Sequence, residues 1–214
     1  MVILGLTGSI GMGKTVAAGL FRRLGVPVHD ADAAVHRLLG PGGGAVAAVA
    51  QAFPGVAAEG RVDRRELGRR VFGDAAALRR LEALLHPAVR LDQRAFLQGA
   101  ARRGCRLAVL DVPLLFETGA DLDCDAVAVV SAPRFVQLAR VLARPGMTRA
   151  RLAAVEAQQM PDAGKRRLAD FVIPSGLGRR ETLRAVGRVV AAAETLRPGR
   201  WPWAAPGKER RTDA

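Results

Sequence analysis

Residues 8–15 read Gly-Ser-Ile-Gly-Met-Gly-Lys-Thr and fit the phosphate-loop pattern G-x-x-x-x-G-K-[ST] at every fixed position. An apolar segment at 2–6 precedes them, and a helical pattern at 14–24 follows. Gly8, Gly11 and Gly13 have no Cβ, so the backbone can bend tightly and turn its N–H groups toward an anion. The spacing predicts a strand, an anion-binding loop and a helix in succession.

The chemistry of the loop indicates a nucleoside triphosphate. Lys14 can reach the β- and γ-phosphates, and the Thr15 hydroxyl can hold a magnesium ion. The start of the helix adds the positive end of its dipole. The alternative is a glycine-rich turn that only permits close packing. Packing requires neither a lysine nor a hydroxyl at these places, so nucleotide binding is favoured.

Composition narrows the class of protein. A chain of 214 residues, half of them hydrophobic and a quarter charged, is typical of one globular domain. No apolar run reaches the length of a membrane span, and the N-terminal apolar segment lacks the features of a signal peptide. Cys105 and Cys124 are the two cysteines, which favours free thiols in a reducing cytoplasm over a disulfide.

The net charge of +13 comes from arginine, because lysine supplies only three of the 33 basic residues. Such a composition fits GC-rich coding as well as a polyanionic partner. The arginines are spread over several predicted helices, and the chain has no tyrosine to stack on bases. We therefore expect small phosphorylated substrates and no nucleic acid or membrane partner, with the protein a monomer or weak homo-oligomer.

Strand and helix patterns alternate along the chain, which predicts an α/β fold with a parallel sheet. The predicted strands are 2–6, 26–29, 107–110, 126–130 and 171–173. Helical patterns are predicted at 33–39 and 45–53. Three more, at 64–72, 75–85 and 88–103, read as a substrate-covering insertion, and His86-Pro87 interrupts the last two. Arginine-rich helices at 135–144 and 149–159 precede a closing helix at 181–196, and a tail from 198 is expected to be disordered.

Two aspartates follow predicted strands, at the edge where open α/β sheets bind ligands. Asp32 could accept the proton of a substrate hydroxyl facing the γ-phosphate; the alternative is that Asp30 or Asp32 caps the next helix. Asp111 follows four apolar residues and resembles a carboxylate in the second shell of the magnesium ion.

Arg140 and Arg144 stand four apart on a predicted helix, with Gln137 on the same face. Two guanidiniums there would repel each other unless an anion lay between them. A helical lid that presents them to a transferring phosphoryl group is one interpretation, and a solvated arginine face is the other. His86 has no second ligand at metal-binding spacing, so we expect no protein-bound zinc.

The ordered set of motifs resembles the dephospho-CoA kinase family over residues 1–176. The matching segments, in order, are 5–8, 11–15, 24–32, 62–67, 71–72, 81–87 and 109–117, then Gln137, Arg140, Arg144, Gln159 and Lys165, and finally 169–173. The segments Asp-Ala-Asp, His-Pro and Pro-Leu-Leu-Phe-Glu are more specific than the phosphate loop, which many folds share.

The resemblance implies a three-layer P-loop kinase fold, with a core (1–40, 104–134 and 166–197), a helical CoA-binding region (about 41–103) and a lid (about 135–165). It implies transfer of the ATP γ-phosphate, with Mg²⁺, to the ribose 3′-hydroxyl of dephospho-CoA. The implied catalytic residues are Asp32, Lys14 and Arg140. The implied ATP-binding residues are Gly8, Gly11, Met12, Gly13, Lys14, Thr15, Val16 and Arg144, and those for the acceptor are Thr7, Asp32, His86 and Leu114.

The chain departs from the family pattern at Pro174 and Ser175, where an asparagine near the nucleotide base is frequent. Two rival functions stay open from the sequence. One is another small-molecule or nucleoside monophosphate kinase on the same core. The other is a nucleotide-gated protein whose basic surface binds nucleic acid or another protein.

Overall fold

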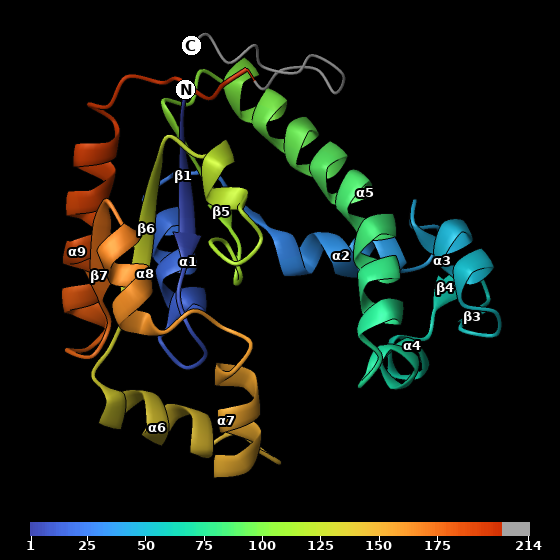
Figure 1. The fold of residues 1–214 in the computed structure, drawn as a ribbon. Coiled ribbons are helices and arrows are strands. Elements are labelled where there is room, and N and C mark those ends of the chain that lie inside the picture. Colours follow the sequence, from blue (N-terminus) through green and yellow to red (C-terminus); the bar gives the residue numbers. More distant parts are fainter. Residues whose placement is uncertain (203–214) are drawn as a thin grey trace, which may run out of the picture. The chain divides into compact units, whose positions relative to one another are not determined.

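The computed structural model describes residues 1–202. Five of its strands are β1 (Val2–Thr7), β2 (Val28–Asp30), β5 (Leu107–Asp111), β6 (Ala126–Ser131) and β7 (Phe171–Pro174). They form one sheet in the order β2-β5-β1-β6-β7, in which β1 pairs in parallel with β5 and β6, and β6 with β7. Figure 1 labels β1, β5, β6 and β7. The predicted parallel α/β fold is confirmed.

The chain divides into two compact units. Unit 1 holds Met1–Val28 and the chain from Arg103 on, and unit 2 is His29–Arg102. Unit 1 therefore carries the phosphate loop and the strands that flank it, while unit 2 is mainly helical. The boundaries of the predicted CoA-binding region and lid stay predictions.

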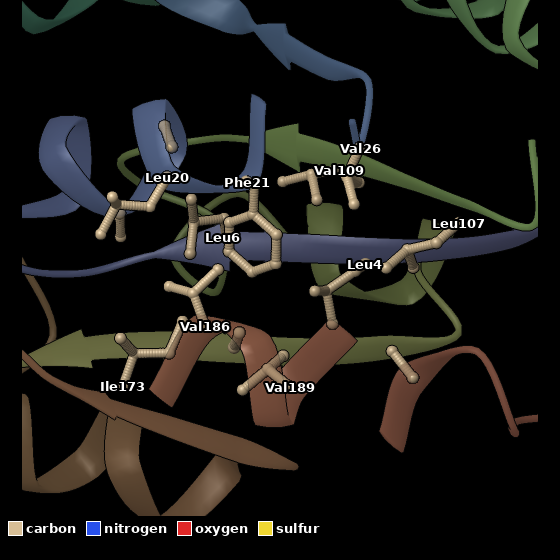
Figure 2. Close-up of a cluster of buried hydrophobic side chains, with 14 of the residues drawn as sticks. Leu4, Leu6, Leu20, Phe21, Val26, Leu107, Val109, Ile173, Val186 and Val189 are labelled. Carbon is tan, nitrogen blue, oxygen red and sulfur yellow. The ribbon is translucent and has the colours of Figure 1, made fainter. Parts of the chain in front are cut away.

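The main core of unit 1 lies between the sheet and the helices α1 (Lys14–Arg23) and α9 (Arg179–Ala193). Leu4 and Leu6 of β1 contribute to it together with Phe21 of α1 and Val186 of α9 (Figure 2). All six residues of β1 are buried, as expected for a strand in the interior of a parallel sheet. This packing fixes the end of β1, from which the phosphate loop starts.

The remaining elements of unit 1 come after β5. They are the 3₁₀ helix η1 (Ala120–Asp123) and the helices α6 (Arg134–Leu142), α7 (Arg149–Glu156) and α8 (Asp162–Leu168). Thr148 caps α7 through a bond from the Arg151 N–H to its hydroxyl. α8 is a short helix that packs against β6, and it was not predicted from the sequence.

Unit 2 has its own small core. Its helices are α2 (Ala31–Leu39), α3 (Val46–Ala52), α4 (Arg64–Val71) and α5 (Ala75–Arg102), and a short antiparallel pair joins β3 (Ala57–Ala58) to β4 (Arg61–Val62). Val49, Phe53, Leu67 and Leu85 are among the buried residues of this core. Asp63 caps α4 by accepting bonds from the N–H groups of Arg65 and Glu66. The β3–β4 pair was not predicted.

The prediction of two helices separated at His86-Pro87 is wrong, because α5 is one helix of 28 residues with Pro87 inside it. Proline removes one backbone hydrogen bond and crowds the preceding turn, which normally ends or kinks a helix. Leu81 and Leu85 are buried before the proline, and Leu97 and Ala100 after it. Burial of both halves offsets the local cost.

The expected tail at 198–214 is described only in part. The N–H groups of Gly199 and Arg200 both donate to Asp125 Oδ1, at 2.7 and 2.8 Å. Residues 203–214 lie outside the described residues. Within residues 1–202, no helix combines the length and the apolar character that crossing a bilayer requires.

Candidate active site

Steric constraints in the phosphate loop explain its glycines. A Cβ on Gly8 would lie 2.6 Å from the Val130 carbonyl oxygen, and one on Gly11 would lie 2.5 Å from Val141 Cγ2. Gly11 and Gly13 also have φ angles of 78° and 89°, where residues with side chains are strained. The loop thus holds a tightly packed shape that other residues could not adopt.

Lys14 begins α1 and points to the end of β5. Its Nζ lies 2.7 Å from Oδ1 of Asp111, whose side chain is only 3% exposed. The parallel register places Leu6 opposite Asp111, so the strand that leads into the loop ends beside this carboxylate. The structure thus brings together the loop lysine and the strand-terminal aspartate that the sequence singled out separately.

The oxygen donors near the loop suit a magnesium ion carried by a nucleotide. Magnesium prefers hard oxygen ligands and usually binds through one or two protein oxygens together with substrate phosphates and water. Thr15, in the first turn of α1, and Asp111 are donors of this kind. No cluster of three or more His, Cys, Asp or Glu able to hold a metal occurs among residues 1–202. Thr15 and Asp111 therefore fit a metal ion that arrives with the nucleotide.

Arg140 on α6 contacts the loop and the segment after β7. Its Nη2 donates to the Ser175 carbonyl oxygen at 2.7 Å, and its Nη1 donates to Ser175 Oγ at 3.0 Å and to the Gly11 carbonyl oxygen at 3.4 Å. Arg140 is therefore positioned beside the phosphate loop by the protein itself.

Arg144 was predicted to share a helix face with Arg140, but the structure places it after the end of the helix. α6 ends at Leu142, Ala143 is its C-cap, and Arg144 is exposed in the turn that follows. Pro145 and Gly146 follow at once, and Gly146 has a φ of 71°, which does not continue a helix. A contact between Arg144 and the nucleotide stays a prediction.

Asp32 lies in the first turn of α2 and is exposed, whereas Asp30 ends β2. The expectation that Asp32 closes the strand is therefore wrong by two residues. Asp30 Oδ1 accepts a bond of 2.9 Å from the Ala33 N–H and caps α2. The capping role considered for either aspartate belongs to Asp30, which leaves the Asp32 carboxylate available for another role.

The residues expected to contact the acceptor have different environments. Thr7 is fully buried, and its hydroxyl donates to the Pro113 carbonyl oxygen at 3.0 Å. Leu114, on the same loop after β5, is 36% exposed. His86 is exposed on α5 in unit 2. Their contacts with a substrate stay predictions.

A buried lysine, whose role sequence reasoning did not assign, fixes the loop after β5. Lys165 of α8 is 0% exposed; its Nζ lies 2.9 Å from Glu117 Oε1 and donates to the Pro113 carbonyl oxygen at 3.3 Å. Burial raises the pKa of Glu117, but the hydrogen bonds from Lys165 and from the Met160 N–H outweigh it and hold the pKa below its ordinary value. This pair joins α8 to the loop that contains Leu114.

A cavity of about 350 Å³ lies beside the phosphate loop in unit 1. Ser9 and Met12 of the loop, Arg134 and Gln137 of α6, and Asp162 of α8 contribute to its wall. Within the described part of the chain, Ser9 Oγ and Asp162 Oδ1 are buried without a hydrogen-bond partner.

His29 is a buried histidine in unit 2 that the sequence analysis did not single out. Its Nε2 lies 2.7 Å from Asp92 Oδ2 on α5, and Arg37 of α2 donates to the same oxygen at 2.8 Å. The ring also packs on Phe96, with 5.3 Å between ring centroids. These contacts tie the end of β2 and the helix that carries Asp32 to α5.

Burial lowers the pKa of His29 from its ordinary 6.5, although Asp92 opposes the shift. A second proton would have to reach Nδ1, which is buried without a partner. Because the folded pKa is the lower one, the contribution of His29 to stability is complete above pH 6.5 and is lost as the pH falls toward the folded value.

We therefore expect His29→Gln to weaken the dependence of stability on pH. Between pH 7.5 and 5.5 the free energy of unfolding should fall less in this variant than in the wild type, by a slope of at most about one proton. Urea unfolding across that range measures it. Equal slopes in the variant and the wild type would contradict the assignment.

The known proteins that this chain resembles in sequence belong to one family. A sequence model of the dephospho-CoA kinase family matches residues 2–177. A dephospho-CoA kinase of Paramagnetospirillum magneticum is 67% identical over 166 residues, which cover 78% of each chain. One of Novosphingobium aromaticivorans is 53% identical over 196 residues, covering 92% of this chain and 96% of the relative.

Solved structures agree in fold. A Thermus thermophilus crystal structure, 37% identical, has a TM-score of 0.77 and covers 89% of this chain and 96% of its own. The dephospho-CoA kinase of Campylobacter jejuni is 21% identical with a TM-score of 0.62, over 89% of this chain and 96% of its own. At that identity the second comparison bears on the fold alone.

Proposed function

The chain belongs to the dephospho-CoA kinase family, and we propose that it transfers the γ-phosphoryl group of ATP to the ribose 3′-hydroxyl of dephospho-CoA, using the residues around its phosphate loop. The products are CoA and ADP. One observation carries the residue assignment: the glycine-dependent loop is followed by Lys14, whose Nζ lies 2.7 Å from the buried Asp111. This arrangement supplies backbone N–H groups and a fixed cation where the triphosphate binds.

Each proposed role follows from the chemistry of its group. The N–H groups of residues 11 and 13–15 and the Lys14 ammonium bind the phosphates, and Arg140 stabilises charge that spreads over the transferring group. Asp32 accepts a hydrogen bond from the 3′-hydroxyl and takes its proton as the new O–P bond forms and the bond to ADP breaks. Thr7, His86 and Leu114 are proposed contacts for the acceptor.

Magnesium is the proposed metal. Thr15 would hold it through its hydroxyl and Asp111 through a bound water, and the ion would neutralise phosphate charge during transfer. We also propose that the enzyme works in the cytoplasm as a monomer or weak homo-oligomer. The free thiols of Cys105 and Cys124 support a reducing compartment.

Coupled measurement of ADP release tests the proposed reaction. With ATP and Mg²⁺, we expect kcat/KM for dephospho-CoA to exceed that for nucleoside monophosphates, adenosine and phosphopantetheine by at least about a hundredfold, because only the full acceptor fills the whole site. Preference for another acceptor would support the rival small-molecule kinase. Turnover of none, with tight and strongly salt-dependent binding of DNA or RNA, would support the nucleic-acid-binding rival.

A further inference from the structure

Three successive carbonyl groups of the phosphate loop each accept a hydrogen bond from a side chain outside the loop. The Ile10 carbonyl accepts from Gln137 Nε2 at 2.9 Å, and the Gly11 carbonyl accepts from Arg140 Nη1 at 3.4 Å. The Met12 carbonyl accepts from Ser175 Oγ at 2.6 Å. We call Gln137, Arg140 and Ser175 the carbonyl brace.

The geometry of the peptide bond gives these contacts a consequence. In a trans peptide the C=O of one residue and the N–H of the next point in opposite directions. A carbonyl held on the outer side of the loop therefore directs the following N–H to the inner side. Gln137 thus orients the Gly11 N–H and Ser175 orients the Gly13 N–H, whereas the Met12 N–H bonds to the Ser9 carbonyl.

Glycine makes such external support necessary. Gly11 and Gly13 adopt positive φ angles, and glycine loses more conformational freedom on ordering than other residues do. Without the brace, part of the free energy of nucleotide binding would be spent on ordering the loop. The packing is tight as well: a Cβ on Gly13 would lie 3.0 Å from Ser175 Oγ and 3.4 Å from Arg140 Nη1.

Ser175 is hydrogen-bonded both to the phosphate loop and to Arg140. Its hydroxyl donates to Met12, while the same oxygen and its own carbonyl accept from Arg140 at 3.0 and 2.7 Å. The residue is 4% exposed, and its N–H donates to the Ser131 carbonyl at the end of β6. One side chain therefore fixes the loop and the arginine together.

Gln137 is held with similar rigidity. It is 3% exposed, and its Oε1 accepts from Arg134 at 2.6 Å while its Nε2 also donates to Glu156 at 3.2 Å. Ile10, whose carbonyl accepts from Gln137, is also held through its N–H, which donates to Gln159 Oε1 at 3.1 Å. The loop is thus supported from α6, from the segment after α7 and from the segment after β7.

We propose that Ser175 and Gln137 are positioning residues that hold the phosphate loop ready for a polyphosphate, and that Ser175 also orients Arg140. The proposal rests on the function proposed above for the loop and for Arg140. It assigns a purpose to Ser175, the position where the chain departs from the family's frequent asparagine.

Calorimetric titration with ADP tests the brace without turnover. Ser175→Ala should raise the Kd for ADP by about tenfold, as expected when one buried hydrogen bond that organises the loop is lost. Ser131→Ala is the matched control: it is also a buried serine, and its hydroxyl donates to Asp162 and not to the loop. The control should keep Kd within about twofold. Gln137→Met provides a second variant and should weaken ADP as Ser175→Ala does.

A double-mutant cycle on kcat tests the link to Arg140. Ser175→Ala should lower kcat by about tenfold in the wild type and by less than about twofold in an Arg140→Ala background. Unchanged ADP affinity in both brace variants, or an equal loss in Ser131→Ala, would overturn the brace. Additive effects on kcat would overturn the orientation of Arg140 by Ser175. An Arg140→Ala variant with wild-type kcat would instead refute the proposed catalytic role of Arg140, and the ADP titration would still decide on the brace.

Discussion

Replacing Lys14 by alanine should lower kcat/KM by at least about three orders of magnitude, the largest loss we expect from any single change. The ammonium group is the positive charge fixed at the start of α1, 2.7 Å from Asp111. Phosphoryl transfer depends mainly on positioning and on stabilising charge on the phosphoryl oxygens. Steady-state measurement of ADP release with dephospho-CoA gives the effect.

Stability must be measured separately for this variant, because Asp111 is 3% exposed and would lose its lysine partner. Loss of one charged hydrogen-bond partner of a buried carboxylate costs on the order of 1–3 kcal/mol. Urea unfolding establishes that the variant is folded under the conditions of the assay. A Lys14→Arg variant keeps the charge but not the compact ammonium, and we expect partial activity from it. More than about a tenth of wild-type kcat/KM in folded Lys14→Ala would contradict the assigned role.

Asp32→Asn should lower kcat by about a hundred- to ten-thousandfold while leaving the Kd for ATP nearly unchanged. The substitution removes the proton acceptor but keeps the size of the side chain, and general-base catalysis contributes within that range. Asp32 is exposed and does not cap α2, but its charge lies in the first turn of that helix, so the free energy of unfolding should fall by less than about 1 kcal/mol. Single-turnover kinetics and ATP titration separate the two effects.

Asp30→Asn is the matched control for this prediction. It makes the same chemical change two residues away, at the N-cap of α2, where asparagine caps about as well as aspartate. Near wild-type kcat in Asp32→Asn, or an equal loss in Asp30→Asn, would show that the carboxylate at position 32 does not act on the hydroxyl.

Short-range sequence patterns were sufficient to predict part of the fold. The five strands were predicted close to their observed positions because each is a short apolar run bounded by polar or turn residues. The phosphate loop was predicted because the spacing of its glycines, lysine and threonine acts within a few residues. The motif order also predicted the family, which the match over residues 2–177 shows.

Other features depended on contacts that no local pattern reveals. A Pro87 inside a helix contradicts local propensity, and only burial on both sides of it keeps α5 continuous. The strand was expected to end at Asp32, but β2 ends at Asp30. The two-residue error arose because α2 begins at the next residue, without a turn that would mark the boundary. His29 and Asp92 are 63 residues apart, so their contact could not be read from spacing.

By itself the sequence determined that this chain has a phosphate loop on a parallel α/β core and belongs among the dephospho-CoA kinases, because glycine conformation, strand burial and the lysine–hydroxyl pair are local properties of the chain. Only the tertiary structure decided how that loop is supported. Ser175 meets Met12 across 163 positions and Gln137 meets Ile10 across 127, and such contacts exist only once the sheet has brought β1, β6 and β7 side by side.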